Sequence, residues 1–275
     1  MKKIRIVVCI LLTIIIIIQG SFFFGLTGKL GVIYLPEYVH TDDASDSRFV
    51  NPEEISSLSN FGYDTFIKIR SSMKYCKNLT RLAIEFRPKK IKNIDFLRNL
   101  TELEVLWIAG ESDDWSGISE CKKVNTLNIR DSNFSELDYL KDMHNIRYFN
   151  IHTSSELIYS DKVDFSSANV IIIKAPLIDV SAIKTALNVT HIGFGASKIS
   201  GLGTLKDMES LNSLILADAD INEENLIDVL KADSVEDLSF FGCNFSISEE
   251  QVNKALKGFY ERKVEVTLDE CVFSE

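Results

Sequence analysis

The chain has few of the residues that common catalytic and metal sites require. Its 275 residues include five cysteines and four histidines. No two cysteines form a CxxC pair, so a zinc site or a thioredoxin-like redox motif is not indicated. No glycine loop suited to phosphate is present, and no serine or cysteine has a basic partner at the spacing of a known nucleophile motif. The sequence therefore predicts no catalytic residues, no metal site and no cofactor, and it argues against an enzyme.

Basic residues are outnumbered by acidic ones. The chain has 30 Lys and Arg against 40 Asp and Glu, a net charge of -10. Because an acidic surface repels phosphate backbones, nucleic acid is not an expected partner. With 45% hydrophobic and 25% charged residues, the composition is that of a folded protein.

One long uncharged run stands at the N-terminus. Residues 6–26 are apolar and follow Lys2, Lys3 and Arg5. At a rise of about 1.5 Å per residue, a helix of this length spans roughly 30 Å, the thickness of the hydrocarbon core of a bilayer. We predict a transmembrane helix in residues 1–27. Since basic flanks stay inside, the N-terminus should be cytoplasmic and the remainder of the chain extracellular.

A cleaved secretory signal is the alternative for this segment. Its apolar region would be residues 6–18, with cleavage near Gly20 or Ser21. That cleavage site is poor, because the apolar run continues through residues 22–24 and no A-x-A pattern occurs. The chain would be membrane-attached in the first case and secreted in the second, so both alternatives export the rest of it.

Two short regions separate this segment from the main body. Residues 28–48 show no sustained period and end in a polar, acidic run, which indicates a stalk. Residues 49–78 are predicted to form an N-terminal cap. Within them Asn51, Pro52 and two glutamates form a helix-start signature, which predicts a helix over 52–59.

From residue 79 to residue 275 the chain repeats itself. Stretches such as LTRLAI, LEVLWI and VNTLNI carry apolar residues at relative positions 1, 4 and 6. One such unit cannot bury its apolar side alone, but stacked units form a continuous core. The pattern therefore predicts an α/β solenoid with one strand per unit. Its nine units start at residues 79, 103, 124, 146, 167, 189, 211, 235 and 263.

This pattern resembles the leucine-rich-repeat family, whose consensus is L-x-x-L-x-L-x-x-N/C-x-L with a period of about 20 to 29 residues. The 22-residue units are similar to those of bacterial internalin-like surface proteins. The last two units carry the segments INEENLIDVLKA and SISEEQVNKALKGFY, which we expect to be helical. They resemble the longer ribonuclease-inhibitor type of repeat. The resemblance implies a curved solenoid whose parallel sheet lines the concave face.

The asparagine of the family consensus is missing from most units. Its side chain normally bonds backbone groups at the turn, so we expect a less regular and less stable ladder here. The residues at this position are Ser132, Ser154, Ala175, Ser197, Ala219, Cys243 and Cys271. Because Cys243 and Cys271 are equivalent residues of adjacent units, they are either buried thiols or close enough to form a disulfide.

The concave face is the predicted binding surface. If positions 4 and 6 of a strand point inward, positions 3, 5 and 7 face the concave side. Exposed aromatic residues and arginines are the usual anchors of protein interfaces. The candidate partner-binding residues are Trp107, Arg130, Tyr148, His152, Ile171, Ile173, His191 and Phe241. Alternatively, the cap, the stalk or a second copy covers part of this face.

These features together predict a non-enzymatic cell-surface module that binds a protein, from a Gram-positive-like bacterium. The alternative function is a structural ectodomain that assembles with itself or within a membrane complex. An exported enzyme or enzyme inhibitor is a third hypothesis, for which the sequence offers no site. The fold alone does not identify the partner, because this architecture has many unrelated ligands.

Overall fold

The computed structural model describes residues 33–34, 49–159 and 161–274. The predicted transmembrane segment lies outside these ranges, as does the predicted stalk apart from residues 33–34. Within the described ranges, no helix combines the length and the apolar character needed to cross a bilayer.

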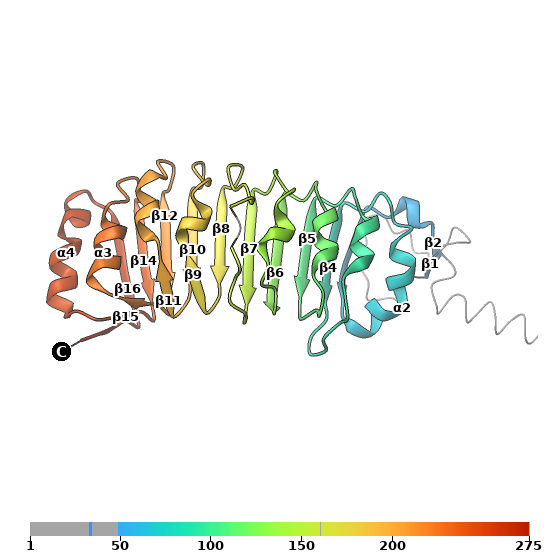
Figure 1. The fold of residues 1–275 in the computed structure, drawn as a ribbon, viewed down its shortest axis with the longest axis horizontal. Helices are drawn as coiled ribbons and strands as arrows, with labels where there is room; N and C mark the ends of the chain where they lie inside the picture. The colour runs from blue at the N-terminus through green and yellow to red at the C-terminus, as the bar shows by residue number, and fades with distance from the viewer. Residues whose placement is uncertain (1–32, 35–48, 160, 275) are drawn as a thin grey trace, which may run out of the picture.

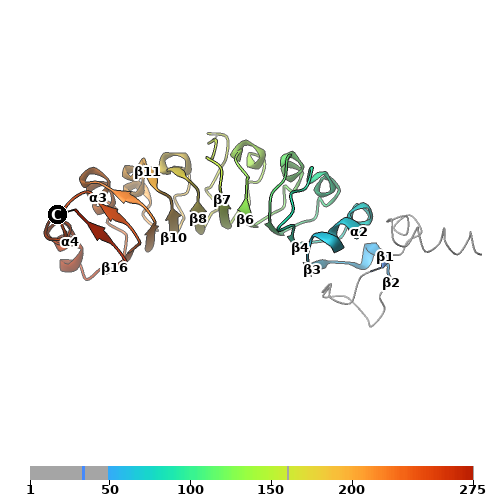
Figure 2. The same ribbon diagram turned by 90° about the horizontal axis from the view of Figure 1, so that it is seen from below.

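A single ten-stranded sheet runs the length of the molecule (Figure 1). Every pair of neighbouring strands in it is parallel. Figure 2 shows an arch, with this sheet on the inner side and the helical segments on the outer side. The α/β solenoid with a concave parallel sheet is therefore confirmed. Its strands are β3 (Ser57–Phe61), β4 (Arg81–Glu85), β5 (Val105–Ala109), β6 (Thr126–Ser132), β7 (Tyr148–Thr153), β8 (Val170–Lys174), β10 (His191–Gly195), β12 (Ser213–Ala217), β14 (Asp237–Phe241) and β16 (Glu265–Asp269).

Alternation along each strand separates core from surface. In the repeat that starts at Val124, Leu127 and Ile129 are fully buried, and Leu106 and Ile108 lie beside them in register on β5. Equivalent apolar side chains of successive repeats therefore stack along the arch. Because each repeat buries its apolar side against the next, removal of apolar surface from water stabilises the whole array.

One repeat is shifted by a residue from its predicted start. β8 pairs with β10 so that Ile171 and Ile173 align with core residues of that strand, and both isoleucines are buried. Their predicted place on the concave face is wrong. The repeat begins at Ala168 rather than at Ser167, because only this register puts apolar residues at positions 1, 4 and 6. Val170, Ile172 and Lys174 face the concave side instead.

The outer side of the arch changes character along the chain. Between residues 79 and 207 the repeats return through short 3-10 helices, except the repeat of β7, whose described residues contain no helix. The two predicted helical segments near the C-terminus are α-helices, which confirms that prediction. Both α-helices begin with a capping box, Asn222 with Asn225 and Ser248 with Gln251. The elements are η3 (Asp95–Asn99), η4 (Ser116–Glu120), η5 (Leu137–Leu140), η6 (Val180–Ile183), η7 (Leu202–Asp207), α3 (Glu223–Leu230) and α4 (Glu249–Glu261).

The N-terminal end of the sheet differs from prediction. Asn51 does cap a helix, but this is the single 3-10 turn η2 (Pro52–Glu54) and not a helix over 52–59. The chain then becomes extended, because Ile55 and Leu58 are drawn into the core and β3 pairs with β4. An α-helix follows as α2 (Tyr63–Met73), and β1 (Ile33–Tyr34) pairs antiparallel with β2 (Phe49–Val50). The predicted cap region thus contributes the first strand of the main sheet.

Small side chains occupy the inward position where the strands from β6 to β14 end. Of the residues predicted to replace the consensus asparagine, Ser132, Ala219 and Cys243 are buried at this position. Ser154 and Ser197 are exposed, and the residues before them are buried instead, so those two predicted positions are off by one. The inward position is shifted by one residue because the repeats of Ser132, Ala219 and Cys243 have an extra turn residue with left-handed backbone before it. These residues are Asp131 (φ 46°), Asp218 (φ 55°) and Gly242 (φ 59°).

Hydrogen bonds at this inward position are intermittent. The Ser132 hydroxyl donates to the His152 carbonyl at 3.0 Å, and the Thr153 hydroxyl donates to the Phe134 carbonyl at 2.7 Å. The Cys243 thiol donates to the Leu216 carbonyl at 3.3 Å. An alanine such as Ala219 has no side-chain group that could bond in this way. Without the consensus asparagine, side-chain hydrogen bonds at this position therefore connect some neighbouring repeats and not others.

The cysteines of the described chain are all free thiols with different exposure. Cys76, Cys121 and Cys243 are buried, whereas Cys271 is half-buried. Burial raises the pKa of Cys76 and of Cys121 to about 12, and that of Cys243 to about 11. Cys243 and Cys271 are therefore thiols in adjacent repeats and not a disulfide in this structure.

Thiol labelling should follow this order of burial. At pH 8 a thiol with a pKa of about 12 is ionised in about one molecule in ten thousand, and only the thiolate reacts. We expect the folded chain to be alkylated first at Cys271, and at Cys76 and Cys121 only after denaturant is added. Peptide mass spectrometry at successive times measures this, with unfolded chain as the control. Labelling of Cys76 as fast as that of Cys271 in the folded chain would contradict the buried placement.

Candidate functional site

The concave face is the candidate site, and its central row of side chains is uneven. The row contains the middle residue of each strand, held in register by the parallel pairing. Large and polar side chains alternate along this row with an alanine and a glycine, and two hollows form beside these small residues. From β4 to β14 the row contains Ala83, Trp107, Asn128, Asn150, Ile172, Gly193, Ile215 and Ser239.

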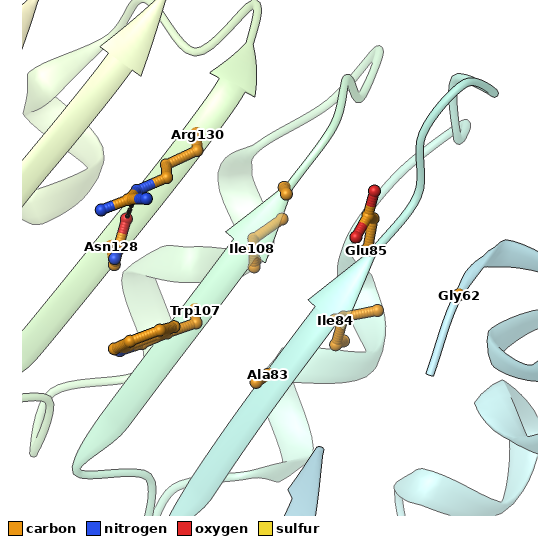
Figure 3. Close-up of a pocket in the computed structure, with 9 residues that line it drawn as sticks. Gly62, Ala83, Ile84, Glu85, Trp107, Ile108, Asn128 and Arg130 are labelled. Atoms are coloured by element: carbon orange, nitrogen blue, oxygen red, sulfur yellow. Dashed lines mark hydrogen bonds between the residues drawn. The ribbon is translucent and has the colours of Figure 1, made fainter. Parts of the chain in front are cut away.

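The first hollow lies beside Trp107, and we call it the Trp107 hollow. The indole is 48% exposed although it stands in the middle of a sheet face. Figure 3 shows it extending from β5 toward β6, while the small side chain of Ala83 on β4 leaves space on its other side. The hollow has a volume of about 280 Å³, and Glu85 and Arg130 are among the residues that line it. An aromatic wall together with charged groups can hold both apolar and polar parts of a ligand.

Arg130 is positioned by its neighbour. Its Nε donates to Oδ1 of Asn128 at 3.1 Å, and Asn128 is itself buried. Figure 3 shows the guanidinium bending back over Asn128. The contact restricts the rotamers of Arg130, so less conformational entropy is lost when a partner binds there.

A row of charged side chains lies at the carboxyl ends of the neighbouring strands. Arg87 contacts Glu85 at 2.8 Å and Asp131 at 2.5 Å. Nδ1 of His152 lies 3.3 Å from Oδ1 of Asp131. The left-handed backbone at Asp131 projects its carboxylate between Arg87 and His152. No sequence pattern pointed to this cluster, because it depends on the extra turn residue at the end of β6.

The second hollow lies over Gly193, and we call it the Gly193 hollow. Its volume is about 490 Å³. Ile172 on β8 and Ile215 on β12 flank Gly193 in register, so the missing side chain leaves a gap between two aliphatic walls. Its lining residues include Val170, Ile172, Gly193, Gly195, Ile215 and Ala217, with His191, Ser213 and Lys174 also in contact with it.

Six of the eight predicted site residues lie on the concave face. Trp107, Arg130, His191 and Phe241 are exposed there, and Tyr148 and His152 are half-buried. They do not form one cluster. Trp107 and Arg130 share the first hollow and His191 borders the second, whereas Phe241 lies farther along, on β14. Because Ile171 and Ile173 are buried, Val170 and Ile172 take their place as candidates. Counting this repeat from Ala168 as position 1 would have placed Val170 and Ile172 on the concave face from the sequence alone.

Metal-binding groups are dispersed in the part of the chain that the structure describes. It contains no group of three His, Cys, Asp or Glu residues arranged to hold a metal ion. His152 on β7 and His191 on β10 are separated by β8.

Comparison with known proteins gives matches at the level of structure. No protein-family model and no curated protein sequence matches the chain. An internalin from Listeria monocytogenes matches with a TM-score of 0.64 and 17% identity, covering 84% of this chain and 66% of its own. A leucine-rich-repeat protein from Leptospira interrogans matches with a TM-score of 0.53 and 14% identity, covering 74% and 58%. A chain of the mouse RP105/MD-1 complex matches with a TM-score of 0.51 and 13% identity, covering 73% and 35%. The chain thus spans less than two thirds of the length of these proteins, and at such identities the likeness concerns the fold.

Proposed function

We propose that this chain, which has the leucine-rich-repeat fold of the internalins, is a non-enzymatic module that binds a protein partner on its concave face. The observation that carries the proposal is the exposed indole of Trp107 beside an open hollow. An aromatic side chain in the middle of a water-facing sheet contributes little to the fold, whereas such residues dominate protein interfaces. The similar chain from the RP105/MD-1 complex supports a binding role for this architecture.

Replacement of Trp107 by alanine tests the proposal. A central aromatic anchor contributes about 2 kcal/mol or more to binding, so we expect capture of the partner to fall about thirtyfold. The measurement is crosslinking and pull-down from the native cell surface, quantified by mass spectrometry. A matched control is Ile227→Ala on the outer helix α3, because Ile227 is also an apolar residue with 46% exposure. Equal capture by Trp107→Ala and by the control would refute the site.

Self-assembly is the second candidate function, and the last strand of the sheet favours it. Among the described residues β16 pairs only with β14. Val266 and Leu268 on this strand are only half-buried, and Val272 nearby is 60% exposed. An unpaired edge with apolar side chains is a template for another strand. Light scattering of residues 49–275 separates the candidates, since a monodisperse monomer argues against self-assembly.

We also propose that residues 6–26 anchor the chain in a membrane, with a cytoplasmic N-terminus and an extracellular repeat domain. The uncharged run and the basic residues before it support this topology. The mass of the chain purified from membranes and from the culture medium is the test. Retention of the N-terminal segment supports the anchor, and its loss near Gly20 identifies a cleaved signal and a secreted protein.

A further inference from the structure

The Gly193 hollow is open although the backbone does not require glycine there. In the described chain, the glycines with left-handed backbone are Gly110, Gly201 and Gly242, and Gly193 is not among them. A Cβ atom at Gly193 would meet Ile172 at 3.7 Å, an ordinary van der Waals distance. A larger residue would therefore fit and would strengthen the strand, because glycine weakens a strand interior. The Gly193 hollow is therefore not required for the stability of the fold.

Acidic side chains face the concave side on the two strands beyond this hollow. Asp237 stands on β14, and Glu265 and Asp269 stand on β16. Asp237 accepts hydrogen bonds from the hydroxyls of Ser213 and Ser239. Among the described residues, no Lys, Arg or His forms an ion pair with any of these three carboxylates. Their charge is therefore available to a cationic partner.

The opposite side of the hollow carries little net charge. Lys174 on β8 lies against it, but its Nζ is 3.0 Å from Oδ2 of Asp218. Because this pair neutralises Lys174, the electrostatic field over the hollow is set mainly by the acidic strands. From β10 to β16 the concave face therefore changes from an aliphatic hollow to a negatively charged patch.

We infer that the Gly193 hollow binds a single aliphatic side chain of an extended polypeptide segment that crosses the strands, and that a Lys or Arg of that segment pairs with Asp237 and Glu265, which stand side by side in register on β14 and β16. The inference rests on the proposed binding function and specifies the chemistry of its partner. The aliphatic side chain fills the gap between Ile172 and Ile215. The cation meets carboxylates that lack a partner cation in the described chain.

Strand spacing fixes the distance between the two recognition elements. Neighbouring strands lie about 4.8 Å apart, so β14 is about 10 Å and β16 about 14 Å from the strand of Gly193. An extended peptide advances about 3.4 Å per residue. The aliphatic residue and the cationic residue of the partner are therefore separated by three or four positions along the chain.

A random peptide library supplies an unbiased probe. The full 275-residue chain is reconstituted in lipid nanodiscs, because residues 6–26 are apolar, and a dodecapeptide phage library is selected against it. We expect enriched peptides to carry Leu, Ile, Val or Met three or four positions from a Lys or Arg. Fluorescein-labelled synthetic peptides of the enriched sequence are then titrated by anisotropy. Enrichment without that pair of residues overturns the inference.

Gly193→Leu is the decisive variant. It fills the hollow from a position that faces solvent, so peptide affinity should fall at least tenfold while the melting temperature stays the same or rises. Gly258→Leu is the matched control, because Gly258 is exposed on the outer helix α4 and a Cβ atom there would have no neighbour within 4 Å. Asp237→Asn combined with Glu265→Gln should weaken binding two- to fivefold at low salt, an effect that disappears at high salt.

The outcomes distinguish this inference from the proposed function. If the peptides bind Gly193→Leu as well as the native chain but lose affinity for Trp107→Ala, the concave face binds protein and the Gly193 hollow does not. If neither variant changes the affinity, both the inference and the concave binding site are wrong. A second copy of this chain is the competing occupant. Dimers of the native chain that Gly193→Leu converts to monomers would assign the hollow to that copy and overturn the inference.

Discussion

Replacing Ile171 by lysine should unfold the protein, whereas the same change at Ile172 should be tolerated. Ile171 is fully buried and lies between Phe149 on β7 and Ile192 on β10. A lysine there would place an unpaired ammonium among apolar side chains, which costs several kcal/mol. That cost is comparable with the roughly 5–15 kcal/mol that stabilises a typical domain. Circular dichroism should show loss of the cooperative melting transition for Ile171→Lys.

Ile172→Lys is the internal control for this prediction. Ile172 is half-buried on the concave face beside Gly193, so a lysine there can extend its ammonium into water. The melting transition should be retained, with a change in stability of about 1 kcal/mol or less. If Ile172→Lys unfolded and Ile171→Lys folded, the repeat would begin at Ser167 and the concave face would have to be redrawn.

The sequence predicted the arrangement of strands well because alternation and spacing reinforce each other in most repeats. In the repeat of Leu127 and Ile129, the polar Asn128 separates the two apolar residues, and only one register buries them both. In the repeat of β8 that discrimination fails, because Val170, Ile171, Ile172 and Ile173 are all apolar. Either register then buries two β-branched residues. The structure resolves the choice through pairing with β7 and β10, which the repeat shares with its neighbours.

The candidate site was less predictable than the fold. Exposed Trp107 and Phe241 followed directly from the alternation. The Trp107 hollow also depends on the small Ala83 in register beside it, and the Gly193 hollow depends on the corrected position of Ile172. A hollow is defined by the side chains that are absent between two walls, so a single strand cannot reveal it. The ion pairs of Asp131 required a left-handed non-glycine residue, which a sequence pattern does not specify.

Gly117→Ala should destabilise the protein by roughly 3 kcal/mol, although it adds one methyl group. Gly117 lies in η4, on the outer side of the arch. A Cβ atom there would stand 2.5 Å from the carbonyl oxygen of Ile94 and 2.8 Å from its carbon. These are backbone atoms, so the clash cannot be relieved by a side-chain rotation. The η3 and η4 turns would have to separate, which would weaken the stacking of two adjacent repeats.

The same change at Gly258 should have the opposite sign. Gly258 lies within α4, where a Cβ atom would have no neighbour within 4 Å. Alanine is favoured over glycine in a helix interior by about 1 kcal/mol, so Gly258→Ala should stabilise the chain. Urea denaturation of the two variants therefore should give midpoints on either side of the native value. A midpoint for Gly117→Ala at or above the native value would mean that the two turns can move apart at no cost, and that neighbouring repeats are coupled through the sheet alone.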